Sequence, residues 1–297
     1  MSRVRTKLRH RQQGIALLLV LWVLILLGLI AASSLRESRL GTNLARNIAE
    51  NAKAEALADA GTQRAMVGLL DPDPATRWRM GTAYDFAFAD GTVVVRIEDE
   101  GGKVDLNRAP EPVLLALLEA VGADPERARA LSDAIHDFRD ADHEPRTTGA
   151  EDPDYHAAGL EAGAKDAPFD DTEELMQVLG MTREIHAAIR PYVTVHSRRG
   201  RINLLTASEF VLRAVPNLKP EQLEKILADR ADPARLDSVR ADVVTVRAEA
   251  VTRGGGAFTR EAVLRQTREP QQPFTIVDWR QAWRSAPDLR EAGTAEQ

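Results

Sequence analysis

An unbroken apolar run near the N-terminus is the feature that most constrains how this 297-residue chain can fold. Residues 14–32 read GIALLLVLWVLILLGLIAA, which contains no charge and has the length of a helix that spans the hydrocarbon core of a bilayer. The segment before the run carries five cations and no acid: Arg3, Arg5, Lys7, Arg9 and Arg11. Because basic segments stay on the cytoplasmic side, we expect residues 15–33 to be a single-pass helix of the cell inner membrane, with a cytoplasmic N-terminus and a periplasmic C-terminal domain.

The helical pattern continues beyond the apolar run. Leu40, Leu44, Ile48 and Ala52 recur at four-residue spacing among charged side chains, which is typical of a helix with one apolar face. The pattern ends before Pro72. The sequence therefore predicts one long helix, apolar on all sides in its first half and amphipathic in its second half, where it can pack on a sheet.

Three interpretations fit this N-terminal segment. A cleaved secretory signal has a shorter apolar core, of about 7 to 15 residues, and is cut at the far end of that core. A plain uncleaved membrane anchor is the second interpretation. The third is a leader of residues 1–14 that is removed between Gly14 and Ile15, and the abrupt junction of basic tail and apolar run at that point favours it.

The rest of the chain alternates between strand and helix patterns. Residues 84–100 alternate around the dipeptide Asp90-Gly91, which is typical of a β-hairpin. Helical patterns follow, and strand patterns return near the C-terminus, so we predict an α+β fold in which the long N-terminal helix packs on an antiparallel sheet with an inserted all-α domain. The predicted parts are a leader at 1–14, a membrane helix at 15–33, a stalk helix with the first strands at 34–102, the inserted helical domain at 103–235, the C-terminal strands at 236–284 and a polar tail at 285–297.

The inserted domain contains a repeated pattern. Residues 105–109 (DLNRA) and residues 202–207 (INLLTA) each place a short polar run before a Leu-rich helix, which predicts an internal duplication. Both units resemble helix-hairpin-helix repeats, so a membrane-anchored DNA-binding or uptake protein is an alternative. The hairpins read VGAD at 121–124 and VPNL at 215–218, however, and lack the paired glycines and flanking cations of DNA binders. We interpret both units as packing modules.

An acidic loop between the helical units is a candidate metal site. If Asp140 is position 1, then Asp142, Glu144 and Glu151 fall at positions 3, 5 and 12 of an EF-hand loop, but Pro145 stands where that loop needs glycine. The loop is therefore not an EF-hand, and a merely solvated acidic loop is the alternative. Oxygen ligands in a flexible loop favour calcium. The candidate ligands are Asp140, Asp142, Glu144, Glu151, Asp152 and Asp154.

Composition and motifs argue against an enzyme and against nucleic acid as a partner. The net charge is −6, and the first thirteen residues hold +5, which leaves −11 on the remainder and would repel a phosphate backbone. The chain has no cysteine, and no catalytic motif such as G-x-S-x-G or H-E-x-x-H occurs. His136, His143 and His156 fit no compact zinc pattern, so we expect them to be surface histidines.

The first seventy residues resemble the minor pseudopilin K family of type II secretion systems. The resemblance is carried by RQQGIALLLVLWVLILLGLIAASSLRESRLGTNLARNIAENAKAEALADAGTQRAMVGLL. It implies that a prepilin peptidase cuts after Gly14 and methylates Ile15. Leu19 occupies the fifth mature position, where most pilins carry glutamate and this family does not. The resemblance extends to about Trp279 and implies a pilin-like fold with inserted SAM-like units and calcium in the acidic loop.

The family resemblance also implies a function and a set of partners. We expect a subunit at the tip of a periplasmic pseudopilus that initiates its assembly and supports protein export across the outer membrane. The expected partners are the minor pseudopilins of the I and J types, the filament of the major pseudopilin and the inner-membrane assembly platform. A bulky insertion that clashes inside a helical filament is the physical reason to expect the end position.

Overall fold

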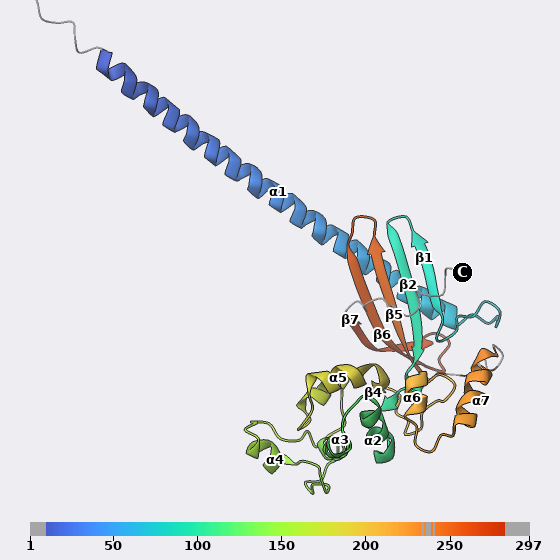
Figure 1. Cartoon of the computed structure of the whole chain (residues 1–297). Coiled ribbons are helices and arrows are strands. Elements are labelled where there is room, and N and C mark those ends of the chain that lie inside the picture. The colour runs from blue at the N-terminus through green and yellow to red at the C-terminus, as the bar shows by residue number, and fades with distance from the viewer. Residues whose placement is uncertain (1–9, 233–234, 236–238, 240, 283–297) are drawn as a thin grey trace, which may run out of the picture.

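The computed structural model describes residues 10–232, 235, 239 and 241–282 (Figure 1). Its longest element is α1, His10–Leu69, whose first half extends away from the globular part while its second half packs on a sheet. The helix ends shortly before Pro72, as the sequence pattern predicts. It begins inside the predicted leader, so residues 10–14 of that segment are helical.

The first half of α1 presents apolar side chains to its surroundings. Every side chain of residues 17–30 is exposed, including Leu17 at 73% and Trp22 at 69%. Across the part of the chain that the structure describes, no helix combines the length and the apolar character that a bilayer crossing needs. The membrane helix at 15–33 stays a prediction.

Five antiparallel strands form one sheet in the order β1-β2-β5-β6-β7. The first hairpin turns at Asp90-Gly91, where Phe88 pairs with Gly91, and this confirms the predicted turn. Strand β5 returns from the inserted segment to lie between β2 and β6, which explains why the insertion leaves the sheet continuous. The strands are β1 (Ala83–Phe88), β2 (Gly91–Asp99), β5 (Val243–Thr252), β6 (Ala257–Gln266) and β7 (Phe274–Gln281).

Small side chains line the face of α1 that packs on the sheet. Their size lets the helix backbone approach the strands closely, where valine and isoleucine side chains of β2 complete the core. The small residues are Ala54, Ala58, Thr62 and Ala65, all fully buried.

Polar contacts then fix the position of α1 along the sheet. The guanidinium of Arg260 on β6 is buried and donates to Asp59 at 2.7 Å and to Glu55 at 2.8 Å, both on α1. One end of the contact is closed by Thr252 on β5, whose hydroxyl donates to Glu50 at 2.7 Å. Because Glu55 and Asp59 are one helical turn apart, sliding the helix by a turn would leave the buried guanidinium of Arg260 with only one of its two carboxylates.

The opposite face of the sheet carries charges paired across neighbouring strands. Glu261 on β6 accepts from Arg247 on β5 at 3.0 Å and from Arg280 on β7 at 2.7 Å. These residues are direct neighbours in the strand register. Cross-strand pairing of this kind satisfies a polar face without a second layer.

The inserted segment, predicted at 103–235, contains the elements from β3 to α7. Most of it is helical, but β3 and β4 form a two-stranded parallel pair, so the prediction of an all-α insertion is wrong in this detail. Strands of two residues are too short to give an alternating sequence pattern. The elements are β3 (Val104–Asp105), α2 (Glu111–Ala120), α3 (Pro125–Arg139), α4 (Asp152–Ala157), η2 (Thr172–Gln177), α5 (Arg183–Ile189), η3 (Arg190–Tyr192), β4 (Val193–Thr194), α6 (Glu209–Arg213) and α7 (Pro220–Ala231).

The two halves of the insertion repeat the same local structure. In the first unit, α2–α3, the side chain of Arg139 at the end of α3 donates to the carbonyls of Leu106 and Ala109. In the second unit, α6–α7, Arg230 makes the equivalent bonds to the carbonyls of Leu204 and Ala207. Both arginines close the turn that precedes the first helix of their unit, and the structure thus shows the predicted duplication.

The hairpins of the two units also correspond. Gly122 and Asn217 have φ angles of 98° and 62° and provide the left-handed residue of each hairpin. Glycine and asparagine adopt this conformation most readily. The second helix of each unit then begins with a proline, at Pro125 and Pro220, which is favoured in the first helical turn.

A buried carboxylate joins the sheet to the insertion. Glu100, in the turn η1 (Glu100–Gly102) between β2 and β3, is 3% exposed and accepts from Thr245 on β5 at 2.7 Å, from Thr194 on β4 and from Lys103 at 2.7 Å. Burial alone would raise the pKa of Glu100, but the charge of Lys103 and these hydrogen bonds outweigh it and lower the pKa. Glu100 therefore stays ionised at the junction.

Candidate metal centre

The acidic loop lies against one face of α3. Asp137 accepts backbone N–H groups of Arg146 at 3.1 Å and of Ala150 at 2.9 Å. Asp133, one turn earlier on α3, accepts the backbone and hydroxyl hydrogens of Thr148. Two carboxylates of the helix thus fold residues 140–150 back onto α3 and direct the following residues toward the insertion core.

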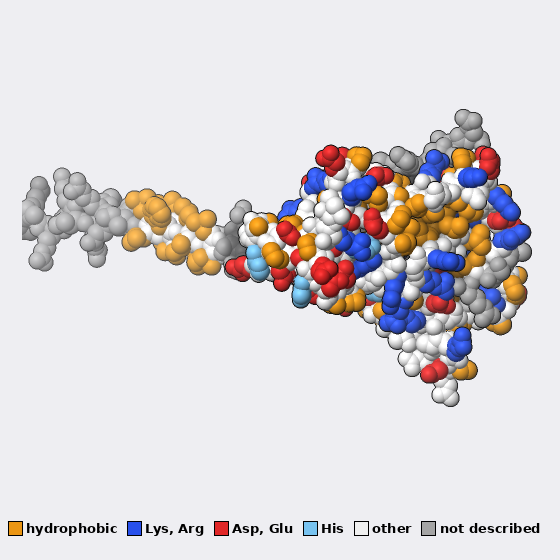
Figure 2. Space-filling model, turned by 90° about the horizontal axis from the view of Figure 1, so that it is seen from below, with side chains coloured by type: hydrophobic (Ala, Val, Ile, Leu, Met, Phe, Trp, Pro, Cys, Tyr) orange, Lys and Arg blue, Asp and Glu red, His pale blue; other side chains and the backbone are white. Residues whose placement is uncertain are grey.

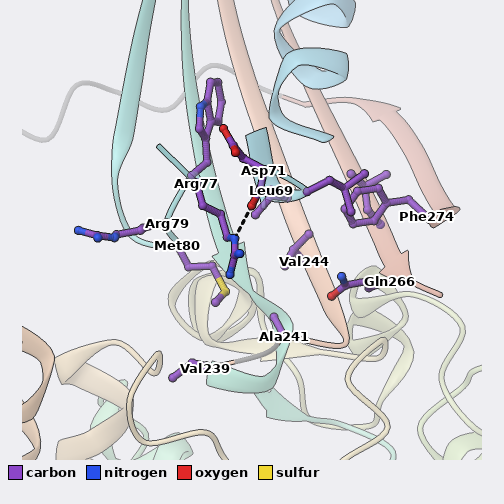
Figure 3. Close-up of a pocket in the computed structure, with 13 residues that line it drawn as sticks. Leu69, Asp71, Arg77, Arg79, Met80, Val239, Ala241, Val244, Gln266 and Phe274 are labelled. Atoms are coloured by element: carbon purple, nitrogen blue, oxygen red, sulfur yellow. Dashed lines mark hydrogen bonds between the residues drawn. The ribbon is translucent and has the colours of Figure 1, made fainter. Parts of the chain in front are cut away.

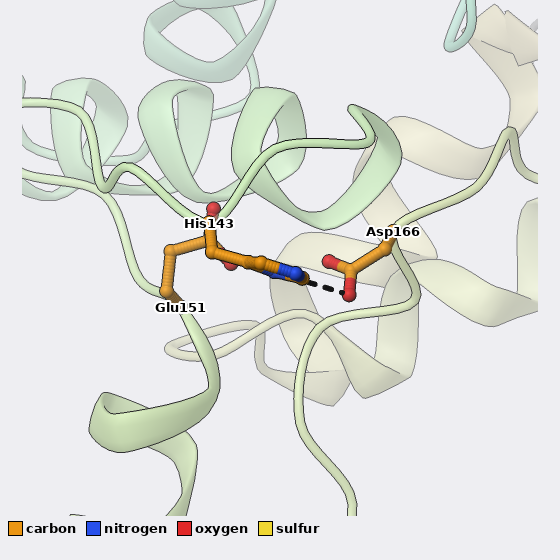
Figure 4. Close-up of side chains that lie close together, drawn as sticks. All are labelled: His143, Glu151 and Asp166. Carbon is orange, nitrogen blue, oxygen red and sulfur yellow. Dashed lines mark ion pairs between the residues drawn. The ribbon is translucent and has the colours of Figure 1, made fainter.

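Three of the six predicted ligands come together. Oxygen atoms of Asp140, Asp142 and Glu151 lie within 4.8 Å of one another. A second group shares Glu151 and adds His143 and Asp166, again with all ligand atoms within 4.8 Å of one another. In Figure 4, His143 and Asp166 face each other above Glu151, and the Nδ1 atom of His143 is 3.5 Å from an oxygen of Asp166.

Glu151 is the centre of the cluster. Its side chain is 2% exposed, and neither carboxylate oxygen has a hydrogen-bond partner. Burial, followed by the charges of Asp137, Asp166 and Asp140, raises the pKa of Glu151 to about 7. Burying a carboxylate without a partner costs several kcal/mol unless a proton or a cation neutralises it.

The other three predicted ligands are placed differently. Asp154 accepts the backbone N–H of Glu151 at 3.0 Å and so caps α4. Asp152 accepts the backbone N–H of Ala164 at 3.0 Å and fastens the next loop. Glu144 is exposed and belongs to neither group of possible ligands among the described residues.

Asp166 is the residue that the sequence argument missed. It lies in a separate loop, outside the EF-hand spacing, and has a φ of 53°, a conformation that suits aspartate better than most side chains. One oxygen of Asp166 and one of Asp140 are also buried without a hydrogen-bond partner. Asp166 stands between Lys165 and Ala167, so no spacing of acidic residues in the sequence predicts a metal ligand there.

The histidines divide in the same way. His143 and His156 are exposed, as predicted, although His143 joins the cluster. The prediction of a surface position is wrong for His136, which is 6% exposed and whose Nδ1 atom lies 2.8 Å from the carbonyl of Ser132. Its place on the inner face of α3 explains the burial.

The cluster fits a hard cation. It offers carboxylate oxygens from three separate segments, one histidine nitrogen and no sulfur, a donor set that suits calcium better than zinc. Four carboxylate oxygens, two of Glu151 and one each of Asp140 and Asp166, are buried without a hydrogen bond and could turn to such an ion. The residues best placed to hold it are Asp140, Asp142, Glu151 and Asp166.

The predicted processing site lies in the long N-terminal helix. Gly14 and Ile15 both fall within α1, near its start. Processing and methylation there stay predictions.

A cavity of about 440 Å³ opens at the lower end of the sheet (Figure 3). Apolar side chains of Leu69, Val244 and Phe274 line it, together with Arg77 and Asp71 from the loop after α1. The guanidinium of Arg77 donates to the carbonyl of Asp71 at 2.7 Å, so this arginine holds its own loop. The lining therefore mixes apolar and polar side chains, and its residues form no arrangement of acid, base and nucleophile.

Comparison with known proteins points to one family. Residues 94–198 match the family model described as type II secretion system (T2SS), protein K. The chain is 29% identical over 285 residues to the type II secretion system protein K of Klebsiella pneumoniae, which covers 88% of this chain and 82% of the relative. It is 28% identical over 248 residues to protein K of Pseudomonas aeruginosa, which covers 75% of this chain and 74% of that protein.

The fold is also shared with a solved structure. The crystal structure of the GspK-GspI-GspJ complex from the type 2 secretion system of enterotoxigenic Escherichia coli contains a chain that superposes with a TM-score of 0.57 at 20% identity, over 84% of this chain and 100% of that chain. The family match covers β2 to β4, which includes the acidic cluster, and the relatives cover most of the remaining length. The chain is thus similar in sequence to protein K of type II secretion systems over most of its length.

Proposed function

We propose that the protein is a minor pseudopilin at the tip of the type II secretion pseudopilus, where it initiates pseudopilus assembly and supports protein export across the outer membrane. The observation that carries this proposal is α1, whose exposed apolar half projects from a globular part built on its other half (Figure 1). An apolar helix of this kind buries its surface against sister helices or lipid. The role in this proposal is structural and not enzymatic.

The position of the insertion supports the tip. Elements β3 to α7 lie beyond the end of the sheet at which α1 ends, opposite the projecting half of the helix (Figure 1). In a filament whose subunits stack along their α1 helices, a further subunit would need that space. The insertion therefore favours a subunit with neighbours below it and none above it.

Processing and anchoring complete the proposal. We expect a prepilin peptidase to remove residues 1–14 and to methylate Ile15, after which the apolar run anchors the chain in the inner membrane with its globular part in the periplasm. Gly14→Val should block cleavage and abolish secretion in a strain that depends on this chain. The matched control is Gly28→Val in the same run, where an added side chain meets nothing within 4 Å. Mass spectrometry of the mature N-terminus is the measurement, and cleavage of the Gly14→Val chain would contradict the proposal.

The proposed position at the tip also predicts the binding partners of the protein. The solved relative forms a complex with GspI and GspJ, and we propose that this chain binds the I-type and J-type minor pseudopilins of its own system, then the major pseudopilin filament and the assembly platform. Co-purification of the three full chains from membranes tests the tip complex. Recovery of this chain without either minor pseudopilin would contradict it.

Calcium is proposed to stabilise the insertion through the acidic cluster. The support is the buried and unpartnered carboxylate of Glu151 between Asp140, Asp142 and Asp166. Isothermal titration of the full chain with calcium should show binding that Glu151→Gln abolishes. The control is Glu144→Gln, an exposed acid of the same loop outside the cluster. Equal binding by the two variants would contradict the site.

A further inference from the structure

Five arginines from three segments form a surface where the insertion meets the lower end of the sheet. We call them the cationic surface: Arg108 before α2, Arg198, Arg199 and Arg201 after β4, and Arg265 near the end of β6. All are exposed except Arg265, which is half-buried. In Figure 2, Lys and Arg side chains are numerous over the middle and right of the globular face seen from below.

The backbone brings the first two of these segments together. Asp105, buried at the end of β3, accepts the Ser197 hydroxyl at 2.8 Å and the backbone N–H of Arg198 at 2.7 Å. A Cβ atom at Gly200 would lie 2.9 Å from the carbonyl oxygen of Arg108. Only glycine therefore lets these two loop segments approach so closely. The arginines are thus held next to one another by a buried network.

The third segment joins through a loop that leads into β5. Arg199 forms an ion pair with Asp242, and the carbonyl of Asp242 accepts the backbone N–H of Gln266 at 2.8 Å. Gln266 follows Arg265 directly, and Arg265 lies close enough to Arg198 for their charges to interact. Two acids, the buried Asp105 and the exposed Asp242, therefore lie among five cations in this region.

Arg198 and Arg265 of this surface repel each other. Within the described part of the chain, Arg108, Arg198, Arg201 and Arg265 form no ion pair, and only Arg199 does. Burial and the neighbouring charge of Arg198 both lower the pKa of Arg265. On the outer face of the sheet, by contrast, Arg247 and Arg280 both pair with glutamate. Like charges held together without counter-charges are stabilised when an anionic partner binds.

We propose that the cationic surface binds an acidic segment of a partner protein. Planar guanidinium groups bind carboxylates through paired hydrogen bonds, and several of them side by side fit a run of Asp and Glu. A lipid surface is disfavoured by position, because residues 33–69 of α1 separate this end of the sheet from the apolar run by about 55 Å at 1.5 Å per residue. This contact would be an additional one for a protein with the proposed function. It involves neither the acidic cluster nor the surface of α1.

Binding of a fluorescently labelled oligo-glutamate peptide to the full chain in detergent tests the proposal. The triple variant Arg198→Gln, Arg201→Gln and Arg265→Gln should weaken binding about tenfold or more, and added salt should weaken binding to the unaltered chain. The control is Arg129→Gln, Arg183→Gln and Arg253→Gln, which removes the same charge from exposed arginines elsewhere. It should change the affinity less than about twofold.

Three outcomes would overturn the inference. The peptide fails to bind the unaltered chain, or both triple variants lose affinity equally, or vesicles of anionic lipid or duplex DNA bind at this surface while the peptide does not. The co-purification of minor pseudopilins is a separate measurement, so failure of the tip complex and failure of this surface can be told apart. Circular dichroism of each variant shows whether a loss of binding reflects unfolding.

Discussion

The two helix-hairpin-helix units of the insertion share one design and differ in how much they bury. Arg139 and Arg230 close equivalent turns, and Gly122 and Asn217 turn equivalent hairpins. In the first unit α3 is buried along most of its length, whereas α7 in the second unit has no buried residue. The first unit also supports the acidic cluster through the loop that follows α3. The shared turns therefore set the shape of a unit, and packing sets its stability.

The core should show the largest difference between the units. Leu117 on α2 is fully buried, and Leu117→Ala should lower the free energy of unfolding by about 2–5 kcal/mol because it leaves a cavity. Leu227 on α7 is only partly buried, so Leu227→Ala should cost about 1 kcal/mol. Urea denaturation of the full chain in detergent measures both. A larger loss for Leu227→Ala would reverse the comparison.

Calcium should act on one unit alone. If free calcium is a hundredfold above its dissociation constant, binding stabilises the folded state by about 2.7 kcal/mol, which a chelator removes. On removal of calcium, hydrogen exchange should speed up in α3 and α4 and stay unchanged in α7, because the cluster lies in the loops that follow α3 and flank α4. Equal effects of the chelator on both units would show that the ion acts elsewhere.

The closing arginines should matter in both units, and more in the first. Arg139→Leu leaves the buried carbonyls of Leu106 and Ala109 without their donor, which should cost about 2–3 kcal/mol. Arg230→Leu should cost about 1–2 kcal/mol, because its turn is less deeply buried. Thermal unfolding monitored by circular dichroism is the measurement. If Arg139→Leu is as stable as the unaltered chain, the turn does not need the hydrogen bonds that Arg139 donates.

The hairpin residues should give the smallest effects. Gly122→Ala places a Cβ at a φ of 98° and should cost about 1 kcal/mol or more. Asn217→Gly should be neutral or stabilise by a few tenths of a kcal/mol, since its φ of 62° suits glycine as well. Urea denaturation measures both effects as shifts of the midpoint, while the slope of the free energy against urea concentration should stay the same. Destabilisation by Asn217→Gly would mean that the asparagine side chain itself supports the turn.

Much of the fold can be read from the sequence because local signals agree with it. The Asp90-Gly91 hairpin, the repeated turns and the end of α1 before Pro72 all depend on neighbouring residues. The parallel pair β3–β4 has no such signal, because Val104 and Val193 meet only after the chain between them has folded.

The candidate metal site could likewise be predicted only in part. Spacing within one loop identifies Asp140, Asp142 and Glu151, but it cannot identify Asp166, which arrives from another loop. The sequence argument includes Asp154 as one more acid of the loop, and its carboxylate instead accepts the backbone N–H of Glu151 at the start of α4. Pro at the first turn of α4 with an acid three residues after Glu151 is a recognisable helix start.

The polar contacts between α1 and the sheet bear on mechanics. Arg260 holds Glu55 and Asp59, and Thr252 holds Glu50, at three levels along the helix axis. A force applied along α1 would be resisted in shear by all of these bonds together, and rupture would require them to break at once rather than one after another. The helix and the globular part would therefore move together as one rigid body when force is applied along α1.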